Sequence, residues 1–170
     1  FMQKFHFFIF IIVVIISQAC TVSLINTGID YTVLESFSLE QFEVKNSNAP
    51  PTSGQVFSEQ LKDRILNNTR LKYVDEDGDI QFSGNVTGYN ITALAPQADQ
   101  TVAFQRLTIQ LTIDYKDIKQ KDGSKDWNQN FSRFANFSAD QDLSSVEDAL
   151  IQEIYDQVLD DVFNKAFSGW

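Results

Sequence analysis

A strict alternation of apolar and polar residues over residues 107–115 constrains the fold of this chain more than any other feature. Every second side chain in this segment is apolar: Leu107, Ile109, Leu111, Ile113 and Tyr115. The positions between them carry Thr108, Gln110, Thr112 and Asp114. Successive side chains of a β-strand point to opposite faces of its sheet, so the pattern predicts one buried face and one water-facing face. A second layer must therefore cover one side of the sheet.

Two segments have the helical spacing that such a layer requires. Apolar side chains recur every four positions within residues 53–67, which predicts an amphipathic helix that begins at a capping box formed by Thr52 and Gln55. A longer helix is predicted after a second capping box, Ser144 and Glu147, with Lys165 in its last turn. Its apolar stripe consists of Val146, Leu150, Ile154, Val158 and Val162. Both stripes are expected to pack on the sheet.

The remaining strands are predicted from shorter alternating segments. They cover residues 33–44, 70–74, 80–91 and 127–137. A change of alternation near Gln41 indicates a bulge or a strand end. Asp77-Gly78 and Asp122-Gly123 favour hairpin turns. The predicted fold class is therefore α+β: a two-layer sandwich with two helices on one face of a mainly antiparallel sheet of four to five strands.

The N-terminal segment has a different character from the rest of the chain. Residues 7–16 are ten uninterrupted apolar residues, which at about 1.5 Å each span only about half of a bilayer core. Ser17-Gln18-Ala19-Cys20 follows them and resembles a cleavage site that ends in small residues. We therefore expect residues 1–19 to be a cleaved signal peptide, residues 20–32 a lipid anchor and tether, and residues 33–170 a single α+β domain.

Cys20 is the predicted site of lipidation. Ala19 and Cys20 match a lipoprotein signal, whereas Ser17 and Gln18 do not, and an ordinary signal peptidase would cut the same bond. Cys20 is also the only cysteine in the sequence, so no internal disulfide can use it. Acylation of its thiol gives the unpaired cysteine a function, and we expect it to anchor the protein in the membrane.

The charged and chemically reactive residues exclude several classes of function. The formal net charge is −10, which argues against nucleic-acid binding because that requires neutralisation of phosphates. The only histidine, His6, lies inside the predicted signal peptide, so Ser-His-Asp catalysis and the common zinc sites have no ligands in the mature chain. The acidic segment 75–79 lacks the glycine and glutamate spacing of a calcium-binding EF-hand loop. We therefore predict no enzyme activity, no cofactor and no metal.

Glycosylation sequons were considered as a separate functional signal. They begin at Asn67, Asn85, Asn90, Asn130 and Asn136. Several fall inside predicted strands, and the chain is rich in asparagine generally. We interpret them as a consequence of composition.

Five segments together resemble the Bacteroidetes form of LptE, the lipopolysaccharide-assembly outer-membrane lipoprotein. They are FSEQLKDRILNNTRL (57–71), GDIQFSGNVTGY (78–89), RLTIQLTIDY (106–115), FSRFANF (131–137) and the stretch from VEDALIQEI (146–154) to VFNKAFSGW (162–170). The resemblance lies in their order and spacing, and it covers nearly all of the chain after the predicted signal peptide.

The resemblance implies a non-catalytic role in the outer membrane. Proteins of this family plug the LptD β-barrel, assist its assembly and help to deliver lipopolysaccharide or lipooligosaccharide to the cell surface. The expected location is therefore the outer membrane, with a lipid anchor and with the domain facing the periplasm or the barrel lumen. Two alternatives remain: a free-standing periplasmic lipid- or glycolipid-binding lipoprotein with a groove between helices and sheet, and an accessory subunit of another outer-membrane complex.

Arg106 and Arg133 are the candidate contacts for lipopolysaccharide. Arg106 opens the alternating strand, and Arg133 lies on a neighbouring predicted strand that a hairpin would bring close to it. The planar guanidinium group donates two parallel hydrogen bonds to a phosphate, which suits phosphorylated lipid A. The alternative is that both arginines pair with nearby carboxylates or with the barrel wall.

Overall fold

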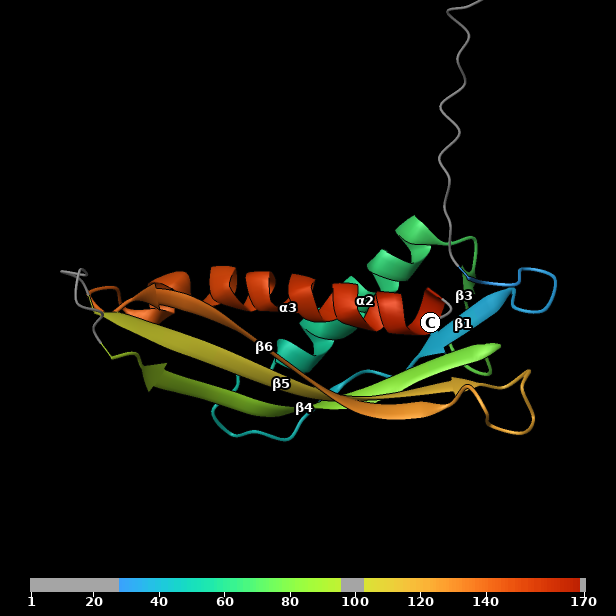
Figure 1. Ribbon diagram of the computed structural model, residues 1–170, viewed down its shortest axis with the longest axis horizontal. Coiled ribbons are helices and arrows are strands. Elements are labelled where there is room, and N and C mark those ends of the chain that lie inside the picture. Colours follow the sequence, from blue (N-terminus) through green and yellow to red (C-terminus); the bar gives the residue numbers. More distant parts are fainter. Residues whose placement is uncertain (1–27, 96–102, 169–170) are drawn as a thin grey trace, which may run out of the picture.

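A two-layer arrangement of helices over a sheet is the main feature of the fold. The structure, a computed structural model, describes residues 28–95 and 103–168. Helices α2 (Ser53–Asn68) and α3 (Leu143–Phe167) lie on the same side of the sheet, and α2 crosses α3 at an angle (Figure 1). The predicted α+β sandwich with two helices on one face is thereby confirmed.

The sheet is mixed and has six strands, one more than the upper limit that we predicted. They are β1 (Ser36–Leu39), β2 (Glu43–Val44), β3 (Lys72–Tyr73), β4 (Ile80–Ala93), β5 (Phe104–Asp117) and β6 (Trp127–Ser138). Their order is β3-β1-β4-β5-β6, and β2 pairs with β4. The three long strands β4, β5 and β6 are antiparallel, whereas the short strands make only parallel pairs. The long strands provide most of the sheet.

The core lies between the helices and one face of the sheet. All five alternate apolar residues of β5 are at most 5% exposed, as the alternation predicts. The apolar stripe of α3 packs against them: Leu150, Ile154, Val158 and Val162 are buried, and Val146 is partly buried. The aromatic ring of Phe57 in α2 contacts that of Tyr155 in α3, with centroids 5.1 Å apart. The helices thus contact each other as well as the sheet, and the three elements share one close-packed core.

The turn at Asp77-Gly78 is not the predicted hairpin. Strands β3 and β4 are both parallel to β1, which lies between them, so the connection crosses β1 instead of reversing beside it. Gly78 passes so close to the strand that an added Cβ would lie 2.3 Å from the backbone nitrogen of Ser38. A glycine is required here for close approach to the backbone. The hairpin at Asp122-Gly123 is confirmed, with Gly123 at a φ of 65°.

Two irregularities in the strands change which side chains face the helices. The change of alternation that we predicted near Gln41 is confirmed, because β1 ends at Leu39 and β2 begins at Glu43. A second irregularity lies in β4, where the register with β5 shifts between Val86 and Gly88. This bulge lets Val86 and Tyr89, three residues apart, both point towards the helices and be buried.

Neither predicted capping box is present. Thr52 precedes α2 with a nearly helical backbone (φ −83°, ψ −8°) and makes no side-chain cap, because a capping side chain requires an extended backbone. Helix α3 begins earlier than predicted, after Asp142, so that Ser144 lies within its first turn. Glu147 instead accepts a hydrogen bond from the Tyr89 hydroxyl. Lys165 does lie in the last turn, as predicted.

Candidate functional site

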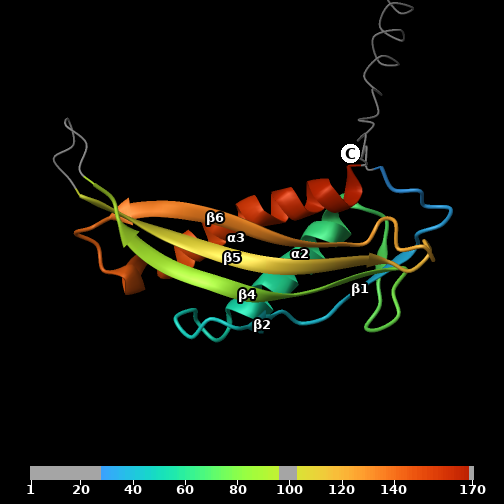
Figure 2. The same cartoon turned by 60° about the horizontal axis from the view of Figure 1, so that its bottom comes forward.

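The side of the sheet that faces away from the helices carries a surface of amides and hydroxyls, which we call the polar face. In Figure 2 the long strands lie in front of the helices, and this side of the sheet comes into view. The polar face consists of Asn85, Gly88, Asn90 and Thr92 in β4, Arg106, Thr108, Gln110 and Thr112 in β5, and Asn130, Ser132, Phe134 and Asn136 in β6. Within this set Arg106 is the one charged residue. Further charges lie on the same side of the sheet beyond the set: Asp114 and Lys116 continue β5, and Glu43 of β2 pairs with Asn85.

The register of the three strands orders these residues into rows. Directly paired residues point to the same face of a sheet, so each row contains one residue from each strand. One row is formed by Asn85, Thr112 and Asn130. Neighbouring strands lie about 4.8 Å apart, and alternate residues of one strand about 6.8 Å apart. The polar groups therefore form a nearly regular grid.

Four of the five sequons begin on this polar face, namely those at Asn85, Asn90, Asn130 and Asn136. In a strand, positions i and i+2 share a face, so the pattern Asn-x-Ser/Thr places two polar side chains next to each other. The sequons at Asn90, Asn130 and Asn136 all lie in such unbroken strand segments. The sequons therefore mark a surface of the sheet and are not only a consequence of composition, as the sequence alone had suggested.

Arg106 lies flat on the polar face. Its guanidinium carbon is 3.7 Å from the centroid of the Phe134 ring, and its Nε donates a hydrogen bond of 3.0 Å to Oδ1 of Asn136. Phe134 is 44% exposed and is the one aromatic residue among the five exposed large apolar residues of the described chain. Arg106 and Phe134 together form a flat cationic and aromatic platform at one end of the polar face.

Arg133 lies on the opposite side of the sheet from Arg106. It pairs with Ile109 in the register of β5 and β6, and Ile109 faces the helices. Its Nε and Nη2 donate hydrogen bonds of 2.7 and 2.8 Å to the two carboxylate oxygens of Asp161 in α3. These bonds raise the pKa of the guanidinium further. The structure therefore does not bring the two predicted arginines together, and contact of either with lipopolysaccharide stays a prediction.

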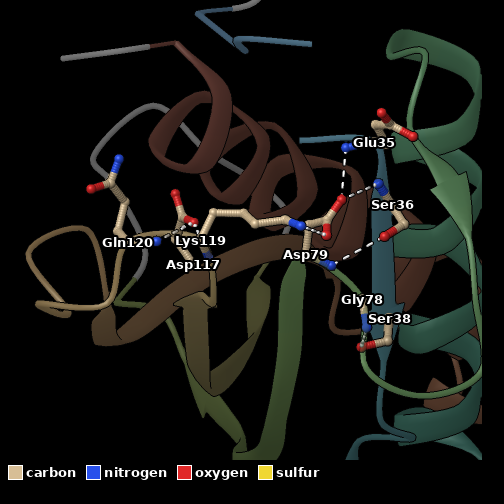
Figure 3. Close-up of polar contacts among 8 residues, drawn as sticks. All are labelled: Glu35, Ser36, Ser38, Gly78, Asp79, Asp117, Lys119 and Gln120. Atoms are coloured by element: carbon tan, nitrogen blue, oxygen red, sulfur yellow. Dashed lines mark hydrogen bonds and ion pairs between the residues drawn. The ribbon is translucent and has the colours of Figure 1, made fainter. Parts of the chain in front are cut away.

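A network around Asp79 holds the other end of the sheet together (Figure 3). The Asp79 carboxylate accepts hydrogen bonds from the backbone nitrogens of Glu35 and Ser36, at 2.8 and 3.0 Å, and its second oxygen is 2.9 Å from the Lys119 ammonium. Burial opposes ionisation of this carboxyl, but the bonds from Lys119, Glu35 and Ser36 outweigh it and lower the pKa to about 2. The network joins β1, β4 and the loop after β5.

A cleft of about 530 Å³ lies where the described chain begins, next to the end of α3. Its lining includes Ile29, Val33, Trp127 and Lys165. The Trp127 ring stacks on that of Tyr115 with an interplanar angle of 7°. The nitrogen of Gly28 donates a hydrogen bond of 2.6 Å to the Phe167 carbonyl, which fixes the start of the domain beside the end of α3.

The remaining predicted sites differ in whether they fall within the described residues. Cys20 and the predicted signal peptide lie outside them, so cleavage and acylation stay predictions. Within residues 28–95 and 103–168, no group of histidine, cysteine or acidic side chains is arranged to hold a metal ion. In the same ranges, neither helix is sufficiently long and apolar to cross a membrane.

Most of the chain matches one protein family. The family model of LptE, described as lipopolysaccharide-assembly, matches residues 34–166. The match extends from the residues just before β1 almost to the end of α3. No curated protein matches the chain.

Several solved structures are similar to this chain at low sequence identity. A hypothetical protein from Chlamydia trachomatis is 10% identical, with a TM-score of 0.51 over 78% of this chain and 98% of that chain. Rare lipoprotein B from Shewanella oneidensis is 16% identical, with a TM-score of 0.47 over 76% of this chain and 92% of that one. The minor lipoprotein from Acinetobacter baumannii is 12% identical, with a TM-score of 0.48 over 78% and 92%.

Proposed function

The chain belongs to the LptE family of lipopolysaccharide-assembly proteins, and from this premise we propose that it is the lipoprotein partner of an LptD-like outer-membrane β-barrel. In this role it occupies the barrel lumen, helps the barrel to assemble and supports the delivery of lipopolysaccharide or lipooligosaccharide to the cell surface. The observation that carries the proposal is the family match over residues 34–166, which includes both helices and all six strands except the last residue of α3.

The surface chemistry of the described domain supports a position inside an aqueous barrel. One broad side is the polar face, and the outer side of α3 exposes Glu153, Asp156 and Asp160. The interior of a large outer-membrane barrel is polar and accommodates plugs. A domain with two hydrophilic broad sides fits that environment.

The packing of the core argues against a lipid carrier with a groove between the layers. Phe57, Leu61, Leu111 and Ile154 lie where such a groove would run, and all four have 0% exposure. A lipid chain would have to displace these side chains, at a cost comparable to that of disrupting the core.

We further propose that the domain is tethered to the membrane through Cys20. In this proposal residues 1–19 are removed, the Cys20 thiol is acylated, and residues 33–170 form the domain that the anchor holds near the outer membrane. The described chain begins at Gly28 beside the end of α3. Cys20→Ser should leave the precursor uncleaved or release the protein from membranes, and normal membrane retention of this variant would contradict the anchor.

The LptE family is non-enzymatic, and the proposed role requires no catalysis by this chain. Its contribution is to occupy space and to present surfaces to the barrel and to the glycolipid. We propose no cofactor, metal or nucleic-acid partner.

Affinity purification from membranes tests the proposal. The full chain with a C-terminal tag is expressed in its host, extracted in mild detergent and purified, and its partners are identified by mass spectrometry. A very large β-barrel protein at a near-equal molar ratio is the expected result. Recovery of bound lipid without any barrel would instead support the carrier, and recovery of a different outer-membrane complex would support an accessory subunit.

A further inference from the structure

We propose that the polar face binds the neutral sugar rings of the glycolipid, a role that rests on the proposed function in lipopolysaccharide assembly. Among the twelve residues of the polar face only Arg106 is charged, whereas the outer side of α3 is acidic. The other charges on this side of the sheet, Glu43, Asp114 and Lys116, lie beyond these twelve residues. An anionic or cationic partner would find little charge on the polar face to complement its own. The partner that fits is uncharged.

Hydrogen-bonding capacity narrows the partner to one rich in hydroxyl groups. Asparagine and glutamine side chains each present an acceptor oxygen and two donor hydrogens, and serine and threonine hydroxyls both donate and accept. The central rows supply such groups from Asn85, Asn90, Gln110, Thr112 and Asn130. An apolar partner would leave them unsatisfied on contact, which is costly. Sugar hydroxyls can both donate to them and accept from them.

The Arg106–Phe134 platform adds an apolar surface to this grid. A sugar ring has one face of C–H groups that packs on an aromatic ring, and Phe134 is 44% exposed. Arg106 is held against the ring by its hydrogen bond to Asn136. Its Nη groups have no hydrogen-bond acceptor among the described residues, so they can donate to ring hydroxyls.

The placement of the cations argues against a phosphate site on this face. Two arginines close together would suit the phosphates of lipid A, but Arg133 lies on the other side of the sheet and is paired with Asp161. On this side of the sheet Arg106 is stacked on Phe134, and Lys116 lies ten residues further along β5, about 34 Å away. The geometry therefore favours the glycan portion of the molecule over its phosphorylated lipid portion.

Binding of a lipid-free oligosaccharide tests the inference. The probe is the oligosaccharide that mild acid releases from the host's lipooligosaccharide, after enzymatic dephosphorylation, and it is titrated into the full chain in detergent by calorimetry. The test variant combines Asn130→Ala and Phe134→Ala, and the control is Asn164→Ala on α3. All three side chains are exposed, so none of the changes removes a core residue. The double variant should raise the dissociation constant at least tenfold, and the control should leave it unchanged.

Three results would overturn the inference. The first is that the oligosaccharide does not bind to the unaltered chain. The second is that the double variant and the control bind it equally well. The third is that the double variant loses the barrel protein in the pull-down while oligosaccharide binding is unaffected, which would assign the polar face to the barrel wall. If the oligosaccharide binds as expected and no barrel co-purifies, the proposed plug function fails and the glycan site stands.

Discussion

The two faces of the sheet are made from the same strands and yet have opposite chemistry. In β5, Ile109 is 1% exposed and faces the helices, while its neighbours Thr108 and Gln110 lie on the polar face. The helix-covered face obtains its stability from apolar burial, at about 25 cal/mol per Å². The polar face contributes little of that kind, because its side chains stay in contact with water. Because side chains alternate along a strand, one strand supplies apolar residues to the core and polar residues to the opposite surface.

The comparison also explains how charge is distributed. Acidic residues gather on the outer side of α3, where Arg64 pairs with Asp156 and Asp160, whereas the twelve residues of the polar face include a single charge, that of Arg106. A helix can expose a charged side in water without affecting its buried stripe. A sheet face that must contact a neutral partner would lose affinity for each charge that it had to desolvate. The acidic side of α3 thus stays hydrated, and the polar face is left with few charges to desolvate.

The largest effect is expected from a charge placed on the covered face. Ile154→Asp puts a carboxylate at a position with 0% exposure and no cationic partner, and we expect the free energy of unfolding to fall by about 4 kcal/mol. Urea unfolding followed by circular dichroism measures it. Ala149→Asp, at an exposed position of the same helix, is the control and should change stability by less than about 1 kcal/mol. Equal effects would mean that this side of α3 does not contact the sheet.

Neighbouring residues of β5 provide the most direct comparison of the two faces. Ile109→Ala removes buried apolar atoms and should cost about 3 kcal/mol, whereas Thr108→Ala should cost less than about 0.5 kcal/mol. Both free energies come from the same denaturation experiment. A large loss for Thr108→Ala would show that the polar face is itself covered, and would contradict its assignment as a binding surface.

Asp79 belongs to neither face and should make stability depend on pH. Its folded-state pKa is about 2, below the ordinary value of 3.8, so its stabilisation is fully present above about pH 4 and is lost as the pH falls towards 2. Because the carboxylate is partly solvated, we expect the contribution to be about 1–2 kcal/mol at pH 6. The difference in melting temperature between the unaltered chain and Asp79→Asn should therefore shrink from pH 6 to pH 2. A constant difference would mean that the ionised carboxylate is not the stabilising species.

Local periodicity explains which parts of this fold could be predicted from the sequence. The alternation over residues 107–115 and the four-residue spacing in α3 depend only on neighbouring positions, and both predictions were confirmed. The place of β1 between β3 and β4 depends on contacts between distant segments. Asp77-Gly78 has the composition of a hairpin turn, but tertiary structure uses its glycine to cross a strand. The short strands β1, β2 and β3 have too few residues for their alternation to predict which strands they pair with.

The candidate surface was predictable in part. The outward side of β5 was foreseen from its alternation, but Arg133 was placed beside Arg106 because only the hairpin connection was considered. Phe131, Ala135 and Phe137 are buried and have the same parity as Arg133, so the alternation of β6 already assigned that arginine to the helix side. The spacing of the sequons, which places pairs of polar side chains on one face of a strand, also indicated the polar face. Which ligand the polar face takes depends on three strands together and could not be derived from any one segment.

The smallest effect concerns the two arginines, which differ in their surroundings on the two faces. Arg133 forms a two-pronged ion pair with Asp161, and both side chains are partly exposed, at 45% and 32%. Such a pair is screened by water and should stabilise the fold by about 0.5 kcal/mol. A double-mutant cycle with Arg133→Gln and Asp161→Asn measures this coupling.

Arg106→Gln is the matched change on the polar face, where the arginine has no carboxylate partner among the described residues. This variant should leave the free energy of unfolding unchanged within error and should weaken oligosaccharide binding. If Arg133→Gln weakened oligosaccharide binding as much as Arg106→Gln, the ligand would contact both sides of the sheet. That result would contradict the proposal that binding is confined to the polar face.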